Sequence, residues 1–303
     1  MTALPTRWEQ QQERATRFWS RLLFWIALRL GRGVARLVLL PTVLYFWLTS
    51  PGVRASSRDY LRRVLPRAPG VGDELRHLYT FAMVSVDRIF ILAGRAARLR
   101  VSEQRPPEVA RVADSGRGCL LFTSHLGGYE SMRLTGTHLH LPLKILMDRA
   151  HGARLHSMFD ALNLSMAQLA IDSDQGGPAL VLEIKQALDA GHMVCINADR
   201  FRGGEKTVEV DFLGGRARLP ASPWLLAQAL RAPLLIGFGL YRGGGRYDNH
   251  FELFAPRVEI PRDRRDAALR DCVQRYADRL AHHARSAPYN WFNFYGYWEP
   301  AGG

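Results

Sequence analysis

The chain has 303 residues, enough to bury one large core or two modest ones, and its content of 47% hydrophobic and 23% charged residues is typical of a folded globular protein. Lys and Arg exceed Asp and Glu by 13, so anionic partners are expected. The three cysteines are odd in number and widely spaced, which excludes a disulfide framework and a cysteine-based zinc site and favours a reducing compartment.

The first 67 residues carry most of this positive charge. They hold twelve arginines against three acids, which gives the segment 12 − 3 = +9. The same segment is rich in Trp, Phe and Leu, as in "FWSRLLFWIALRLGRGVARLVLLPTVLYFWLTS" (residues 18–50). Basic residues beside aromatic and aliphatic ones suit a membrane interface, whereas nucleic-acid arms are basic without being apolar. We therefore expect a membrane partner and no nucleic acid.

The longest uncharged run in this segment is Leu37–Val53. As a helix it would reach about 25 Å, against a hydrocarbon core of about 30 Å, and it contains Pro41. We predict that residues 1–50 form a helical membrane anchor that lies in the membrane plane or folds as a hairpin. A single span and a pair of buried core helices are the alternatives. Residues 51–303 would then form the catalytic domain.

Helices are predicted over residues 52–100, where apolar side chains recur at spacings of three and four. A polar connector with two prolines follows at residues 102–118. Beyond it, short apolar strands alternate with helices. Strands are predicted at 119–124, 143–148, 166–172, 193–199, 207–215, 233–242 and 251–260, and helices at 127–138, 154–162, 178–191, 222–231 and 263–285. This alternation predicts an α/β domain with a mixed, largely parallel central sheet flanked by helices.

A histidine and a carboxylate follow the first of these strands, in "LLFTSHLGGYESM" (residues 120–132). Ligands gather at the carboxyl ends of strands in open α/β sheets, so His125 is expected at that edge. Gly127 and Gly128 carry no side chains and would leave room for a substrate to approach the backbone.

Glu130 is predicted to point back at His125. A carboxylate on one ring nitrogen fixes the tautomer and makes the other nitrogen more basic, ready to take a proton from an attacking hydroxyl. With ten histidines and 28 acids in the chain, about one such spacing arises by chance. A structural histidine in a turn is therefore the alternative to a catalytic pair.

Several stretches of the chain, in their order, resemble a known family. "FTSHLGGYE" resembles the first block of the lysophospholipid acyltransferase superfamily and, more closely, of the late acyltransferases of lipid A biosynthesis, the lauroyl/myristoyl transferase family. That family has an arginine-containing second block, an aspartate-containing third block and a Pro-x-x-Trp tail. In the same places this chain has "LMDRAHGARLHSMFDALN", "VCINADRFRGGEKTVEVDFLGGRARLPASPWLLA" and "APYNWFNFYGYW".

The resemblance implies a glycerolipid acyltransferase-like fold and assigns roles by position. His125 would be the general base and Glu130 its orienting partner. Arg149 would bind the acceptor headgroup or stabilise the oxyanion, and Asp199 is the third-block acid beside the substrate. Two features depart from the family pattern: Arg200 stands where Gln is common, and the aromatic tail replaces a basic ending. The tail is similar to that of the branch linked to aryl-polyene and xanthomonadin pigment clusters.

The implied function is an O-acyltransferase at the cytoplasmic face of the bacterial inner membrane. It would move an acyl group from acyl carrier protein or acyl-CoA to a hydroxyl of a lipid or glycolipid. No metal or cofactor is implied, because a thioester is already activated. An acidic carrier protein would also be attracted by a basic surface.

Three alternatives are kept. The acyl group could be a pigment-type aryl polyene that is attached to a lipid. His125 could activate water in a thioester hydrolase. The protein could instead be a basic membrane-peripheral scaffold or a nucleic-acid binder without enzymatic activity.

Overall fold

The computed structural model describes residues 17–132, 134, 142–147 and 170–298. Among these residues the helices are α2 (Arg17–Thr49), α3 (Pro51–Val64), α4 (Val71–Leu92), α5 (Pro107–Asp114), α8 (Gly177–Asp189), α9 (Ser222–Leu230) and α10 (Arg265–Ser286), with 3-10 turns η2 (Ala96–Arg98) and η3 (Arg262–Arg264). The strands are β1 (Arg100–Gln104), β2 (Cys119–Thr123), β3 (Leu143–Met147), β4 (Ala170–Asp172), β5 (Met193–Asn197), β6 (Thr207–Phe212), β7 (Gly215–Pro220), β8 (Leu234–Gly243) and β9 (Arg246–Ala255).

Seven strands form the central sheet, in the order β1-β9-β8-β2-β5-β3-β4. All neighbours are parallel except β8 and β9, which form an antiparallel hairpin. The predicted α/β fold with a mixed, largely parallel sheet is therefore confirmed. Because β2 pairs directly with β5 and β8, the residues that follow β2 and β5 meet at one edge of the sheet.

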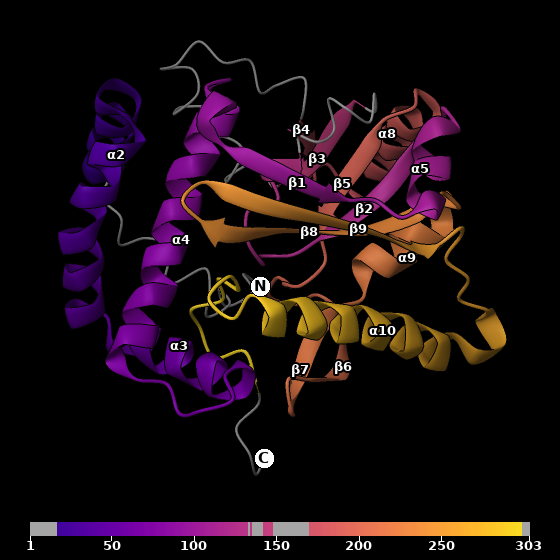
Figure 1. Ribbon diagram of the computed structural model, residues 1–303. Coiled ribbons are helices and arrows are strands. Elements are labelled where there is room, and N and C mark those ends of the chain that lie inside the picture. Colours follow the sequence, from indigo (N-terminus) through magenta and orange to yellow (C-terminus); the bar gives the residue numbers. More distant parts are fainter. Residues whose placement is uncertain (1–16, 133, 135–141, 148–169, 299–303) are drawn as a thin grey trace.

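Both faces of the sheet are covered, which explains the unbroken apolar run of β2. Leu120 and Phe122 point into the larger core with α8, α9, α10 and the β6–β7 hairpin. Cys119 and Leu121 point to the opposite face, where they pack with α5. Figure 1 shows α10 along one side of the sheet and α5 on the other.

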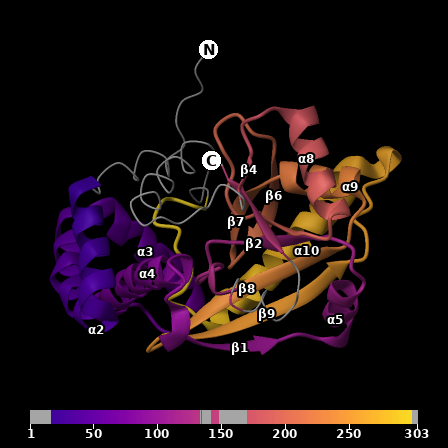
Figure 2. The same cartoon turned by 90° about the horizontal axis from the view of Figure 1, so that it is seen from above.

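Helices α2, α3 and α4 gather at one end of the sheet (Figure 2). Helix α2 bends at Gly31, whose φ of 85° a glycine adopts without steric cost. A buried ion pair ties α2 to α4: the guanidinium of Arg32 donates to both oxygens of Asp87, at 2.6 and 2.9 Å. Tyr247 on β9 donates to the same carboxylate at 2.9 Å. Bidentate geometry and the extra donor satisfy a charge that would be costly to bury alone.

The segment Gly31–Thr49 is long and apolar enough to cross a membrane. One side of it is buried against α4, through Ala35, Leu39 and Val43. The other side presents exposed apolar residues, which are Leu37, Leu40, Leu44, Tyr45 and Leu48. We call these five residues the outer face of α2. A helix with one face against the protein and an apolar face outside suits the membrane interface.

Two local predictions need correction. The predicted connector at 102–118 contains most of strand β1 and the whole of helix α5. The region was not recognised because β1 is an edge strand, whose exposed residues Arg100, Ser102 and Gln104 are polar and interrupt the apolar pattern. Strand β9 also ends earlier than predicted, at Ala255. The helix predicted at 154–162 lies outside the described residues.

Candidate active site

The imidazole of His125 lies just beyond the carboxyl end of β2, as predicted. Its Nδ1 is 2.8 Å from Oδ1 of Asp199, which stands just beyond the carboxyl end of β5. The backbone N–H of His125 donates to the other oxygen of Asp199 at 2.9 Å. The carboxylate therefore holds both the ring and the backbone of His125. No described residue hydrogen-bonds to Nε2, and the His125 side chain keeps 28% of its surface exposed.

The electrostatics fix the protonation states of this pair. Burial lowers the pKa of His125, and the charges of Arg200 and Arg88 lower it further, against the opposing effect of Asp199. Burial alone would raise the pKa of Asp199, but the charge and hydrogen bond of His125 outweigh it and lower the pKa to about 2. At neutral pH the pair is a neutral imidazole on a carboxylate. Nδ1 then carries the proton toward Asp199, and Nε2 is a free base.

The predicted partner of His125, Glu130, has a different role in the structure. Its Oε1 lies 2.6 Å from Nε of Arg88, a residue of α4. The Nη2 of Arg88 donates to the hydroxyl of Tyr129 at 3.0 Å. This corrects the predicted His125–Glu130 pairing: the carboxylate five residues away binds the arginine, and the carboxylate of the neighbouring strand binds the histidine.

The two glycines also serve a purpose other than the predicted one. The N–H of Gly127 donates to Asn290 O at 2.7 Å, and that of Gly128 donates to Gly239 O at 2.8 Å. A Cβ on Gly127 would stand 1.9 Å from Gly239 O, at a φ of +72°. The space predicted for substrate is thus filled by the backbone of β8 at Gly127 and by the side chains of Val84 and Tyr247 at Gly128. Both N–H groups are occupied, so neither is available to an oxyanion.

The C-terminal tail forms a strap along the histidine. The N–H of Phe292 donates to His125 O at 2.9 Å, and the next residue, Asn293, donates through Nδ2 to Asp199 at 3.3 Å. Tyr297 donates to the backbone O of Asp199 at 2.8 Å. We call residues 290–298 the strap. It contacts both members of the His125–Asp199 pair.

A buried histidine supports the strap from behind. His77 of α4 bonds through Nε2 to Trp291 O at 2.9 Å and through Nδ1 to the hydroxyl of Ser57 at 2.9 Å. Burial lowers the pKa of His77 to about 4, although the bond to Trp291 opposes the shift. His77 is therefore neutral, with Nε2–H donating to the carbonyl and Nδ1 accepting from Ser57.

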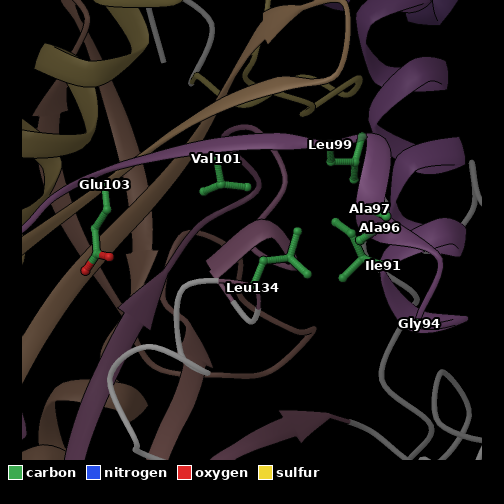
Figure 3. A pocket seen from close by; sticks show the side chains of 8 residues that line it. All are labelled: Ile91, Gly94, Ala96, Ala97, Leu99, Val101, Glu103 and Leu134. Atoms are coloured by element: carbon green, nitrogen blue, oxygen red, sulfur yellow. The ribbon is translucent and has the colours of Figure 1, made fainter.

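An apolar pocket of about 460 Å³ opens beside α4 and β1. Ile91 lies one helical turn beyond Arg88, and Leu134 lies four residues beyond Glu130. Figure 3 shows Leu134 between Val101 of β1 and Ile91 of α4. The pocket thus begins one turn past the Arg88–Glu130 ion pair. The other lining residues are Gly94, Ala96, Ala97, Leu99 and Glu103.

Of the predicted site residues, the structure unites His125 and Asp199 and separates Glu130 from them. Arg149 lies outside the described residues. Arg88 and Asn293 were not predicted. Arg88 has no local signal beyond its place on an apolar helix, whereas the mixture of amide and aromatic residues around Asn293 marked the tail as unusual.

The fold and the site can be compared with known protein families. The model described as bacterial lipid A biosynthesis acyltransferase matches residues 73–299. This range includes the sheet, the His125–Asp199 pair and the whole strap, and it begins after α2 and α3. A comparison with curated proteins found no match.

Proposed function

We propose, from the premise that this chain belongs to the bacterial lipid A biosynthesis acyltransferase family, that it transfers an acyl group from a thioester to a hydroxyl of a lipid or glycolipid. Membership of the family makes the protein an acyltransferase. The proposal adds that His125 is the general base and that Asp199 orients it. The observation that carries this proposal is the hydrogen bond of 2.8 Å between Nδ1 of His125 and Asp199, which leaves Nε2 unengaged by the described residues.

The proton path follows from that geometry. Nε2 of His125 takes the proton of the acceptor hydroxyl while its oxygen attacks the thioester carbonyl. Asp199 stabilises the imidazolium that results. The tetrahedral intermediate collapses, the C–S bond breaks, and the thiolate leaves and takes up the proton from Nε2. One ester and one thiol are formed, and the imidazole returns to its neutral state.

The negative charge of the tetrahedral intermediate needs a donor, and the N–H groups of Gly127 and Gly128 are already used. We propose Arg149 for this role or for the acceptor headgroup, as the resemblance implies. The cation of Arg88 is close enough to lower the pKa of His125. It therefore adds positive potential at the site, partly offset by Glu130.

The donor and the acceptor are proposed from charge and apolar surface. The net charge of +13 favours an acidic acyl carrier protein or the phosphates of coenzyme A. We propose the outer face of α2 as the part that lies in the plane of the membrane, at the cytoplasmic face of the inner membrane. The burial of its opposite side against α4 supports an in-plane helix over a span. Residues 1–50 would thus be the anchor, and residues 51–303 the catalytic domain.

The apolar pocket is proposed as the site of the acyl chain. It lies beside the Arg88–Glu130 pair, and its volume of about 460 Å³ is within the range of small-ligand sites. Its lining side chains are apolar apart from that of Glu103. A saturated chain would gain from burial there.

The test uses the full chain in mixed micelles, with radiolabelled acyl carrier protein thioesters and with lipid A precursor or phospholipid as acceptor. His125→Ala should lower turnover by about 10²–10⁴-fold, the usual worth of a general base. His282→Ala removes an exposed histidine of α10 and should have no effect. Turnover of folded His125→Ala equal to the wild type would refute the proposal.

Two further arms of the assay address the alternatives. Release of acyl groups at the same rate with and without acceptor would indicate a hydrolase. A preference for an aryl-polyene thioester over saturated ones would place the enzyme in the pigment branch. Transfer of saturated chains to the lipid A precursor would exclude both.

A further inference from the structure

The two departures from the family pattern, Arg200 and the aromatic tail, contact each other. Nε of Arg200 donates to Oδ1 of Asn293 at 2.5 Å, and Nη2 donates to Phe292 O at 2.7 Å. The guanidinium also lies 5.8 Å from the ring centroid of Tyr295. The guanidinium of Arg200 therefore contacts a side chain, a backbone carbonyl and an aromatic ring of the strap. Its planar fork of donors allows these contacts together, which a lysine ammonium could not reproduce.

The hydrogen bond from Arg200 fixes the orientation of the Asn293 amide. Arginine has only donors, so it must face the amide oxygen. The Nδ2 group is then left to face Asp199, to which it donates at 3.3 Å. Asn293 is 1% exposed, so water does not compete for either end of its amide. The order Arg200, Asn293, Asp199, His125 is a continuous chain of hydrogen bonds.

The last bond of this chain orients the carboxylate. Oδ2 of Asp199 accepts from two donors, the Asn293 amide and the backbone N–H of His125. Oδ1 is left to accept from Nδ1 of His125. Loss of the amide would leave Oδ2 with one donor and would let the carboxylate rotate about its Cβ–Cγ bond. Nδ1 would then have a partner of less definite position.

We propose that Asn293 and Arg200 are positioning residues of the acyl transfer, which act through Asp199 and make no hydrogen bond to the imidazole. The inference rests on the proposed role of His125 as the base. It assigns a purpose to the unusual tail: the strap holds the carboxylate that orients the base. It also gives Arg200, the residue after Asp199, a role, since its guanidinium reaches both Asn293 and Phe292 of the strap.

Arg200 has a second, electrostatic effect. The charged groups around His125 are Asp199 and Arg200 after β5, and Arg88 of α4 with its partner Glu130. Arg200 lowers the pKa of His125 and Asp199 raises it. Removal of the Arg200 charge makes the imidazole easier to protonate. The pH below which the base is lost should therefore rise.

The experiment compares Arg200→Gln, Arg200→Lys and Asn293→Ala with two matched controls. Arg275 of α10 also donates to a backbone carbonyl, Phe254 O, and lies over an aromatic ring, but away from His125. Arg275→Gln therefore removes the same kinds of contact, to a carbonyl and a ring of Phe254, without touching the strap. Asn290→Ala removes two hydrogen bonds between the strap and Tyr241 and leaves the amide on Asp199 intact.

Two quantities are measured for each variant. The first is kcat and KM for the thioester over a pH series. The second is the titration of His125 itself, followed by NMR with 15N-labelled histidine and assigned through His125→Ala. This second readout requires no turnover. It reports the pKa of His125 in the folded molecules, so a variant that is only less stable gives the same titration as the wild type.

Asn293→Ala should lower kcat by about tenfold or more with little change in KM, in line with the cost of removing a group that orients a reactive side chain. Asn293→Ser, which keeps a short donor, should recover part of the loss. Arg200→Gln should move both the acid limb and the NMR titration to higher pH. Arg200→Lys should keep the pH midpoint of the His125 titration but should lower kcat. Arg275→Gln and Asn290→Ala should leave the titration unchanged.

Unchanged kcat in Asn293→Ala together with an unmoved titration in Arg200→Gln would overturn the inference. If His125→Ala is inactive in the same assays, the proposed function survives that result. If His125→Ala is active, the proposed function itself fails. Should Asn293→Ala not fold, Asn293→Ser and Arg200→Gln still decide the matter.

Discussion

His125 and Asp199 are 74 residues apart in the sequence, yet Nδ1 of the one lies 2.8 Å from Oδ1 of the other. Glu130, only five residues after His125, pairs with Arg88 instead. We therefore expect the two acids to differ when their charge is removed. Asp199→Asn should lower kcat by about 10²–10⁴-fold, because an amide favours the wrong tautomer of the base. Glu130→Gln should cost less, because it leaves the histidine pair in place.

Steady-state kinetics on the two purified variants checks this prediction, with circular dichroism to confirm folding. Tyr129 and Arg88 surround Glu130, so this second variant also reports on the local ion pair. A larger loss in Glu130→Gln than in Asp199→Asn would assign the orienting role to Glu130 after all.

The pH dependence of the reaction follows from the pKa of His125, which burial and the two nearby arginines lower below its usual 6.5. A base with a lowered pKa stays deprotonated, and thus active, to lower pH. The acid limb of kcat/KM should consequently fall below pH 6.5. Asp199, with its pKa of about 2, stays ionised throughout the measured range. Initial rates from pH 4.5 to 8 provide the measurement. An acid limb at or above 6.5 would contradict the burial of the imidazole.

Gly127 should tolerate no side chain. In Gly127→Ala the new Cβ would stand 1.9 Å from Gly239 O, and the φ of +72° adds strain. Gly214 has a similar φ of +74° but no atom within 4 Å of such a Cβ. Gly214→Ala should therefore cost only the backbone strain, about 1–2 kcal/mol. Gly127→Ala should exceed about 4 kcal/mol or fail to fold.

Urea unfolding of both variants separates the two costs. Equal losses would show that the close approach of Gly127 to Gly239 of β8 relaxes without penalty.

The outer face of α2 should bind lipid. Leu40, Leu44 and Leu48 are 54%, 47% and 59% exposed, and transfer of each to an apolar phase is worth about 1.5–3 kcal/mol. The triple substitution of these leucines by Glu should reduce co-sedimentation with vesicles of anionic phospholipid at least tenfold, a factor of ten being about 1.4 kcal/mol. Leu182→Glu, at a leucine of α8 that is 58% exposed, is the control.

The secondary structure of the triple variant should not change, because the buried side of α2 is untouched. Binding that persists at the level of the Leu182→Glu control would place the membrane contact elsewhere.

The apolar pocket should set the acyl chain length. Ala96 lines it, and Ala96→Phe would fill part of its volume of about 460 Å³. The preferred thioester should become shorter, with kcat/KM for the longest accepted chain falling about tenfold, since one or two buried methylenes are worth about 1–3 kcal/mol in discrimination. A series of acyl carrier protein thioesters gives the profile. Ala110→Phe, on α5, serves as control; an unaltered profile in Ala96→Phe would remove the pocket from the reaction.

The sequence alone determined the class of fold and the family. Apolar runs of five or six residues between helical segments predict a buried parallel sheet, because each face of such a strand must be covered. The residue types of the first and third blocks also marked His125 and Asp199. The region before β2 was misread because β1 lies at the sheet edge, where alternate side chains face water and the apolar signal vanishes.

Only the tertiary structure decided which acid serves the histidine. Spacing along the chain favoured Glu130, but the pairing of β2 with β5 brings the ends of two strands together, whatever their separation in sequence. The same holds for the glycines, whose neighbour is the backbone of β8, and for Asn293, which the strap carries to Asp199. The spacing of apolar residues along the chain predicts individual helices and strands, because it reflects which side of each of them is buried. The order of strands in the sheet depends on long-range packing, and that order placed His125 beside Asp199.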